Sequence, residues 1–372
     1  MSSSLPPTPI SPTAPSVGAR RKGPRVLPTL PLSAFTPPST GVGEQFPLPP
    51  DPNTIHPNSV IDAHVITPSG NLSNWHAEID EALKGRLGGA VLSLHGATPG
   101  EVESVISKAS ASETPILALL VPFSLDEGAP TDPPAYLANP GQKPQIVLSS
   151  TFTTNTPAAA EALKWALDKG FSIDIDVQSN LKDNDSEWEA LEDLFAKAMP
   201  HESDSSVPRP KGKVILSNIL PPPDDLHLPI VKLLTHPTYQ AYQSHCAALS
   251  LYSNVFVKFI PPSWGSPTPP TPAPTAQMAI SPVDSPIDPR DTQDKKEWKR
   301  RIKMYIGPSL EAFGYARIIY GSSPSPFTRT KSNAADWYEL ARESFAELGT
   351  EQEGVDAVFY GNAQLVYGSA SS

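Results

Sequence analysis

Residues 116–121 read ILALLV, an apolar run with no polar residue to mark a side that faces water. A strand of this kind is typical of a parallel sheet that is covered by helices on both faces. Other short runs rich in β-branched residues alternate along the chain with longer stretches of helical periodicity. The strands predicted in this way are 60–64, 90–94, 116–121, 145–149, 172–177, 213–218, 254–260 and 317–320.

Most of the intervening stretches predict helices. Pro99 and Pro157 occupy first-turn positions, where proline is favoured. Pro237 is expected to break or kink one long helical stretch, and residues 126–144, rich in Pro and Gly, predict an irregular connection. The other helices are predicted at 74–83, 158–167, 186–198, 228–251, 292–313 and 333–348.

Eight strand-helix units favour a closed (β/α)8 TIM-type barrel, an α/β fold, over an open doubly wound sheet. An open sheet stays as the alternative, although HVI at residues 64–66 stands where a Gly-rich phosphate loop would follow the first strand. We assign residues 58–369 to the barrel. The chain's 46 prolines are unevenly placed. We expect a disordered Pro/Ser-rich tail at 1–57 and, within the barrel, a low-complexity proline-rich insert at 261–290.

Composition limits the kind of partner. A net charge of -11 argues against nucleic-acid binding, and no apolar run is long enough to span a bilayer. One cysteine, Cys246, and the lack of an apolar signal core indicate a reducing, cytoplasmic setting. We expect a small-molecule substrate or ligand and no cofactor. The proline-rich segments could also bind a protein partner, or be tolerated surface chain.

In such a barrel, chemistry is expected at the carboxyl ends of the strands. We predict His64 and Asp176 as catalytic residues, with Asp174 on the same side of its strand as Asp176. Asp176 could instead cap a turn, and a lysine in the seventh strand could pair with a pocket acid or extend to solvent. The predicted substrate-binding residues are His95, Asn218, Lys258, Ser322 and Ser323.

These segments also resemble a known family. Residues 60–64 (VIDAH) are similar to the first strand of amidohydrolase-related proteins of the amidohydrolase 2 type, usually Ile-Asp-x-His-x-His. Residues 317–324 resemble that family's last strand, which closes Gly-Ser-Asp-x-Pro, and 356–368 resemble its terminal helix. Residues 213–221 and 254–258 resemble two family strands that lie between the first and the last, and they occur in the same order and at similar spacing.

The departures from the family pattern concern the catalytic groups. The resemblance implies two histidines on the first strand, one after the sixth, and an aspartate after the eighth, which bind a divalent metal or, in the 2-pyrone-4,6-dicarboxylate lactonase branch, serve a metal-free hydrolysis. Here His64 is kept, while Ile66, Asn218 and Ser323 stand at the other three positions. Since a hydrolytic zinc site needs about three protein ligands, we predict no metal.

Two functions follow from this pattern. The first is an amidohydrolase-related hydrolase that acts on a small lactone, ester or carboxylated ring without the usual metal centre. The second is a catalytically inactive barrel, a pseudoenzyme, that serves as a small-molecule-binding or protein-interaction module. The replacement of three family residues favours the second, and His64 at the end of its strand favours the first.

Overall fold

The computed structural model describes residues 55–138, 143–178, 181, 185–199, 212–219, 228–264, 266–271, 293–328 and 330–368. Most of the predicted tail, residues 1–54, lies outside these ranges. The same is true of the predicted insert from residue 272 onward.

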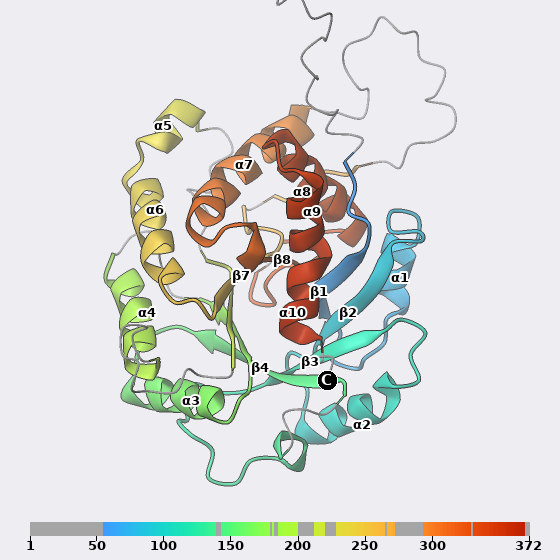
Figure 1. The fold of residues 1–372 in the computed structure, drawn as a ribbon, viewed down its shortest axis with the longest axis vertical. Coiled ribbons are helices and arrows are strands. Elements are labelled where there is room, and N and C mark those ends of the chain that lie inside the picture. Colours follow the sequence, from blue (N-terminus) through green and yellow to red (C-terminus); the bar gives the residue numbers. More distant parts are fainter. Residues whose placement is uncertain are drawn as a thin grey trace, which may run out of the picture. The chain divides into compact units, whose positions relative to one another are not determined.

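Eight parallel strands pair with their neighbours in sequence order (Figure 1). Each of them overlaps one of the strands predicted from the sequence, so the TIM-type barrel is confirmed. The strands are β1 (Val60–Ile66), β2 (Leu87–Ser93), β3 (Ile116–Pro122), β4 (Gln145–Phe152), β5 (Ile173–Val177), β6 (Val214–Ser217), β7 (Val255–Phe259) and β8 (Ile318–Tyr320).

Capping residues and prolines in the sequence mark the ends of several helices. Thr98 forms a capping box with Glu101 at the start of the second helix, and Pro237 divides the predicted 228–251 helix into two. In the described part of the predicted irregular connection, residues 126–138 and 143–144, the chain forms one 3₁₀ turn, η3 (Ala135–Leu137). The helices are α1 (Ser73–Ile79), α2 (Pro99–Ala109), α3 (Pro157–Asp168), α4 (Asp185–Ala198), α5 (Ile230–Leu234), α6 (Pro237–Ser250), α7 (Gln293–Phe313), α8 (Ala334–Glu347), α9 (Gln352–Asp356) and α10 (Asn362–Tyr367).

Alternation along the strands divides the apolar side chains between two cores. One lies between the sheet and the helices, and the other fills the inside of the barrel. The inner core consists of Ile61, Ala63, Val91, Ala118, Leu120, Val147, Ile215, Phe256 and Ile319, together with Ala363, Val366 and Tyr367 from α10.

The C-terminal segment closes the amino end of the barrel. Asp356 accepts hydrogen bonds from the backbone and side-chain nitrogens of Asn58, which precedes β1. Lys213, which precedes β6, donates to the carbonyl oxygen of Leu365 at 2.6 Å. Figure 1 shows α10 in red against the first strands of the barrel. Because this end is plugged, the carboxyl ends of the strands form the open mouth.

The seam between β8 and β1 has no strand ladder like those that join the other neighbouring strands, and it is held by side chains and by one backbone hydrogen bond, from Ser323 N to His64 O at 2.9 Å. Asp62 Oδ1 accepts from the backbone N–H groups of His64 and Ser322, at 3.1 and 2.9 Å. Asp62 Oδ2 accepts from Trp75 of α1 at 2.9 Å. A β-carbon at Gly321 would lie 2.7 Å from His64 Cβ, so only glycine lets the two strands approach this closely.

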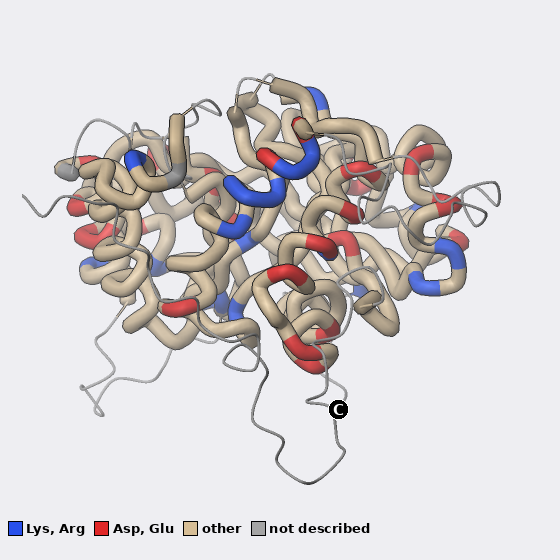
Figure 2. Tube along the Cα trace, turned by 90° about the horizontal axis from the view of Figure 1, so that it is seen from above, with Lys and Arg blue, Asp and Glu red and all other residues tan. Residues whose placement is uncertain are grey.

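Figure 2 shows acidic and basic residues interspersed along the chain, with the most prominent run of Lys and Arg along one helix. On α7, Lys295 and Lys299 pair with Glu343 of α8 at 2.8 and 3.0 Å. Lys299 also pairs with Glu347 at 2.7 Å. The basic charge of α7 is therefore partly offset by its neighbour. Of the helices described, none combines the length and apolarity that crossing a membrane requires.

Candidate functional site

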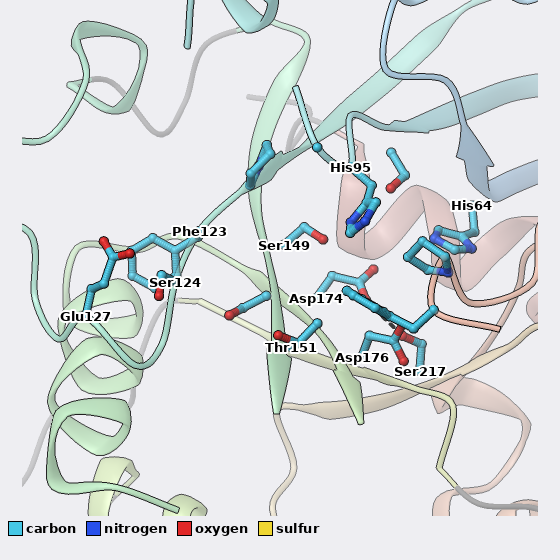
Figure 3. A pocket seen from close by; sticks show the side chains of 16 residues that line it. His64, His95, Phe123, Ser124, Glu127, Ser149, Thr151, Asp174, Asp176 and Ser217 are labelled. Carbon is cyan, nitrogen blue, oxygen red and sulfur yellow. Dashed lines mark hydrogen bonds between the residues drawn. The ribbon is translucent and has the colours of Figure 1, made fainter. Parts of the chain in front are cut away.

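A cavity of about 490 Å³ lies at the mouth of the barrel, where the strands end (Figure 3). Of the predicted site residues, it brings together His64, His95 and Asp176. The remaining lining residues are Ser93, Gly96, Pro122, Phe123, Ser124, Glu127, Ser149, Ser150, Thr151, Asp174, Ser217, Pro326 and Phe327.

His64 is held in one tautomer. Its Nδ1 lies 2.8 Å from the carbonyl oxygen of Ser323, and since a carbonyl only accepts, Nδ1 carries the proton. Nε2 then presents a lone pair, and it makes no hydrogen bond to any residue that the structure describes. Burial, reinforced by the nearby charge of Lys258, lowers the pKa of His64 to about 4. The ring is therefore neutral near pH 7.

Asp176 sits across the cavity floor on β5. Ser325 donates a short hydrogen bond to its Oδ2, and Gln178 donates to Oδ1 at 2.8 Å. Burial raises the pKa of Asp176 to about 7, because it outweighs the lowering effect of these two hydrogen bonds. The carboxyl group can consequently take up or release a proton near neutral pH.

Asp174, one inward position earlier on β5, has a full counter-charge. The ammonium group of Lys258 is completely buried and forms an ion pair with Asp174. Asp174 also accepts hydrogen bonds from Ser217 at 3.4 Å and from the hydroxyl of Tyr367 at 3.5 Å. The reading in which Lys258 extends to solvent is wrong, and the one in which it pairs with a buried acid is confirmed.

His95 and the loop after β8 form one wall of the mouth. The ring of His95 meets the ring of Phe327 edge-on, with centroids 4.9 Å apart. Phe327 remains 48% exposed, so this wall faces solvent on its outer side.

Four predicted substrate-binding residues do not line the cavity: Lys258, which pairs with Asp174, and Asn218, Ser322 and Ser323. Asn218 has a left-handed backbone, with φ of 56°, and its amide group donates to Val177 O at 2.8 Å. Ser323 accepts from Ile66 N through its hydroxyl and from His64 through its carbonyl. The backbone N–H of Ser322 is held by Asp62. Ser322 and Ser323 thus position His64.

Several cavity groups escaped the sequence analysis. Ser149 and Thr151 lie on the same side of β4 as the inward-facing Val147, so strand alternation could have identified them. No sequence pattern identifies Ser325 as a site residue, because its contact with Asp176 joins residues 149 positions apart.

The donor set does not fit a metal centre like the one implied by the family resemblance. His64 retains one ring nitrogen, while Asp174 is paired with Lys258, and Asn218 points its amide group at a backbone carbonyl. Over the ranges that the structure describes, no group of three His, Cys, Asp or Glu side chains is arranged to hold a metal ion. We derive no chemical step through a metal.

Comparisons with known proteins support the fold. No protein-family model matches the chain, and no curated protein does. The structure of an amidohydrolase from Burkholderia multivorans with bound zinc is similar, with a TM-score of 0.53 and 13% identity over 83% of this chain and 99% of that one. A protein from Pseudomonas putida described as a 2-pyrone-4,6-dicarboxylic acid hydrolase has a TM-score of 0.46 and 14% identity over 85% and 99%. At such identities the likeness concerns the fold alone.

Proposed function

We propose that this chain hydrolyses a small ester or lactone, with Asp176 and His64 as the groups that act on water. One observation carries the proposal: a carboxyl group whose pKa is about 7 and a neutral imidazole with an open Nε2 line the same cavity. A general base is most effective when its pKa lies near the working pH, and Asp176 meets that condition. The similar Burkholderia multivorans structure is described as an amidohydrolase, which makes hydrolysis the first reaction class to test.

The proposed reaction needs only the groups in the cavity. Ionised Asp176 takes a proton from a water molecule while the water oxygen attacks the carbonyl carbon of the ester. The other water hydrogen is held by His64 Nε2, which orients the attack. As the bond to the leaving oxygen breaks, protonated Asp176 returns the proton to that oxygen. The products are an acid and an alcohol, which stay joined as a hydroxy acid when the substrate is a lactone.

Hydroxyl groups are available to stabilise the oxyanion. Ser149 and Thr151 line the cavity from β4, and neither side chain is hydrogen-bonded to another residue in the described ranges. Hydroxyl donors aimed at a developing negative charge lower the barrier most when they are fixed in advance. Their position on a strand, and not on a loop, provides that rigidity.

The test is a hydrolysis screen of the full chain on lactones and activated esters, with and without zinc or manganese. We expect turnover without added metal and a loss of at least about 100-fold in both His64→Ala and Asp176→Asn. His76→Ala is the matched control, because His76 lies on α1, outside the cavity. Retained activity in a folded His64→Ala or Asp176→Asn protein would overturn the proposed roles, and turnover that requires metal would overturn the mechanism.

A second candidate is a binding module without turnover. It is favoured by the side chains of Asn218 and Ser323, which do not line the cavity and are hydrogen-bonded to the backbone of Val177 and Ile66. The pairing of Asp174 with Lys258 removes a further carboxylate that a catalytic site could use. Saturable binding of a ligand that is recovered unchanged, in wild type as in Asp176→Asn, would support this function over hydrolysis.

A further inference from the structure

The charges around the cavity are predominantly negative. Its described lining residues include the carboxyl groups of Glu127, Asp174 and Asp176 and no Lys or Arg. The ammonium group of Lys258 is completely buried and offsets Asp174. This leaves Glu127, and Asp176 when it is ionised, without a positive partner in the cavity.

The cavity has two distinct ends. Figure 3 shows His64, Asp174, Asp176 and Ser217 gathered on one side and Glu127 with Phe123 on the other. Glu127 is exposed at the mouth and makes no ion pair or hydrogen bond with any residue in the described part of the chain. Phe123 is held in place by stacking on Trp165, with centroids 5.9 Å apart. The reactive groups are therefore separated from a second, acidic and aromatic end.

A buried polar group between strands gives independent support for a ligand. Ser93 is only 2% exposed, its residue lines the cavity, and its hydroxyl has no hydrogen-bond partner among the residues described. This hydroxyl is not among the fully enclosed polar atoms without a partner, so it opens onto the cavity, where water or a ligand can hydrogen-bond to it. A bound molecule with an oxygen or nitrogen atom at this position would complete the hydrogen bonding of Ser93.

We propose that the substrate is an ester with a cationic end, a protonated or quaternary amine, which lies against Glu127 while the ester bond lies between His64 and Asp176. This inference rests on the proposed function and adds a substrate class to it. The carboxylate of Glu127 attracts the cation, and the ring of Phe123 provides an apolar wall beside it. The same negative charges repel an anion, so a carboxylated ring is disfavoured as substrate.

The test uses probes that differ in charge and hardly in shape. Choline and its uncharged isostere 3,3-dimethylbutanol are titrated into the full chain by calorimetry, and turnover is compared for their butyrate esters and for monobutyl succinate. We expect cationic probes to be favoured by about three- to ten-fold over neutral ones, because an exposed carboxylate contributes a modest, salt-screened attraction. The anionic ester should be the poorest substrate.

Two variants at neighbouring positions make the test specific. Glu127→Gln should abolish the preference for the cation, and Asp126→Asn should keep it, since Asp126 is also exposed but does not line the cavity. Equal binding of choline and its isostere, binding of neither, or a preference that survives Glu127→Gln would overturn the inference. A preference for the cationic probe without turnover of any ester would overturn the proposed hydrolysis and leave this inference standing. Turnover without any preference for the cationic ester would overturn this inference and leave the hydrolysis standing.

Discussion

Asp174 and Asp176 lie on the same face of the same strand and have opposite surroundings. Asp174 forms an ion pair with the fully buried Lys258 and accepts hydrogen bonds from Tyr367 and Ser217. Asp176, one layer closer to the mouth, has only neutral donors, from Ser325 and Gln178. We call these the lower layer and the upper layer.

The difference shows what fixes a carboxylate in place and what keeps one reactive. A buried charge with a counter-charge is held in an ion pair, and removing one partner leaves the other charge buried and uncompensated. A buried carboxyl group with only neutral donors ionises less readily than one in water, and burial raises the pKa of Asp176 to about 7. The lower layer is structural, and the upper layer provides the chemistry that we propose.

The largest expected effect comes from breaking the lower layer. Lys258→Met leaves Asp174 buried without a counter-charge, so we expect the free energy of unfolding to fall by about 3–5 kcal/mol. Denaturant unfolding at pH 8 measures this loss. The double variant Lys258→Met/Asp174→Asn removes both charges and should regain most of the stability. A single variant as stable as wild type would show that the lower layer does not depend on its ion pair.

Removing the charge of the upper layer should raise the free energy of unfolding, whereas removing Lys258 from the lower layer should lower it. The pKa of Asp176 is raised from 3.8 to about 7, so ionising it in the folded protein costs about 4 kcal/mol, and wild type loses that stability as the pH rises from about 4 to 7. Asp176→Asn cannot ionise, so it should be up to about 4 kcal/mol more stable than wild type at pH 8 and equal to it near pH 4.

Unfolding curves of both proteins across this pH range measure the difference. Hydrolysis by Asp176→Asn should be lost over the whole range. If Asp176→Asn is less stable than wild type at pH 8, the ionised carboxylate of Asp176 must itself be stabilised by its surroundings. The proposed difference between Asp174 and Asp176 would then be wrong.

A smaller change sharpens the comparison within the upper layer. Ser325→Ala removes a hydrogen bond that lowers the pKa of Asp176. Because the base must be ionised, activity should rise with pH through the pKa of Asp176, and in the variant this rise should move upward by about one pH unit. The measurement is the pH profile of kcat/KM. Ser325→Thr keeps a hydroxyl and should restore the wild-type profile. Equal profiles for all three proteins would show that Ser325 does not influence the pKa of Asp176.

The smallest effect is expected at the base of the lower layer. Tyr367→Phe removes a long hydrogen bond of 3.5 Å to Asp174 and keeps the ring 5.6 Å from the Lys258 ammonium. The cost should be about 1 kcal/mol or less by denaturant unfolding. A cost as large as that of Lys258→Met would mean that Tyr367, and not Lys258, is the main partner of Asp174.

Local patterns were sufficient to predict the strands. The period of two in IDIDV, residues 173–177, places Asp174 and Asp176 on one face, and the barrel topology then places that face inside. Pro237 likewise shows where a helix has to end, because its ring and its missing N–H are properties of a single residue.

The division of roles at the site depends on contacts between distant parts of the chain. Ser323 resembles a family position that faces the ligand, but its carbonyl bonds to His64, 259 residues away, and its side chain bonds to Ile66. Tyr367 reaches Asp174 from the last helix, across 193 residues. No local pattern predicts such pairs, because the first depends on how closely β8 and β1 approach at the seam and the second on where the last helix packs under β5.

The seam between β8 and β1 has a consequence for the chain as it is being synthesised. A ribosome completes all eight strands before it reaches Gly321, which fits beside His64, and the helix that plugs the barrel floor. Until then, Ile61, Ala63 and Val91 line an unfinished barrel whose interior is open to water. Until the last strand and helix emerge, the nascent chain exposes apolar surface, so we expect a product truncated before them to aggregate more readily than the full chain.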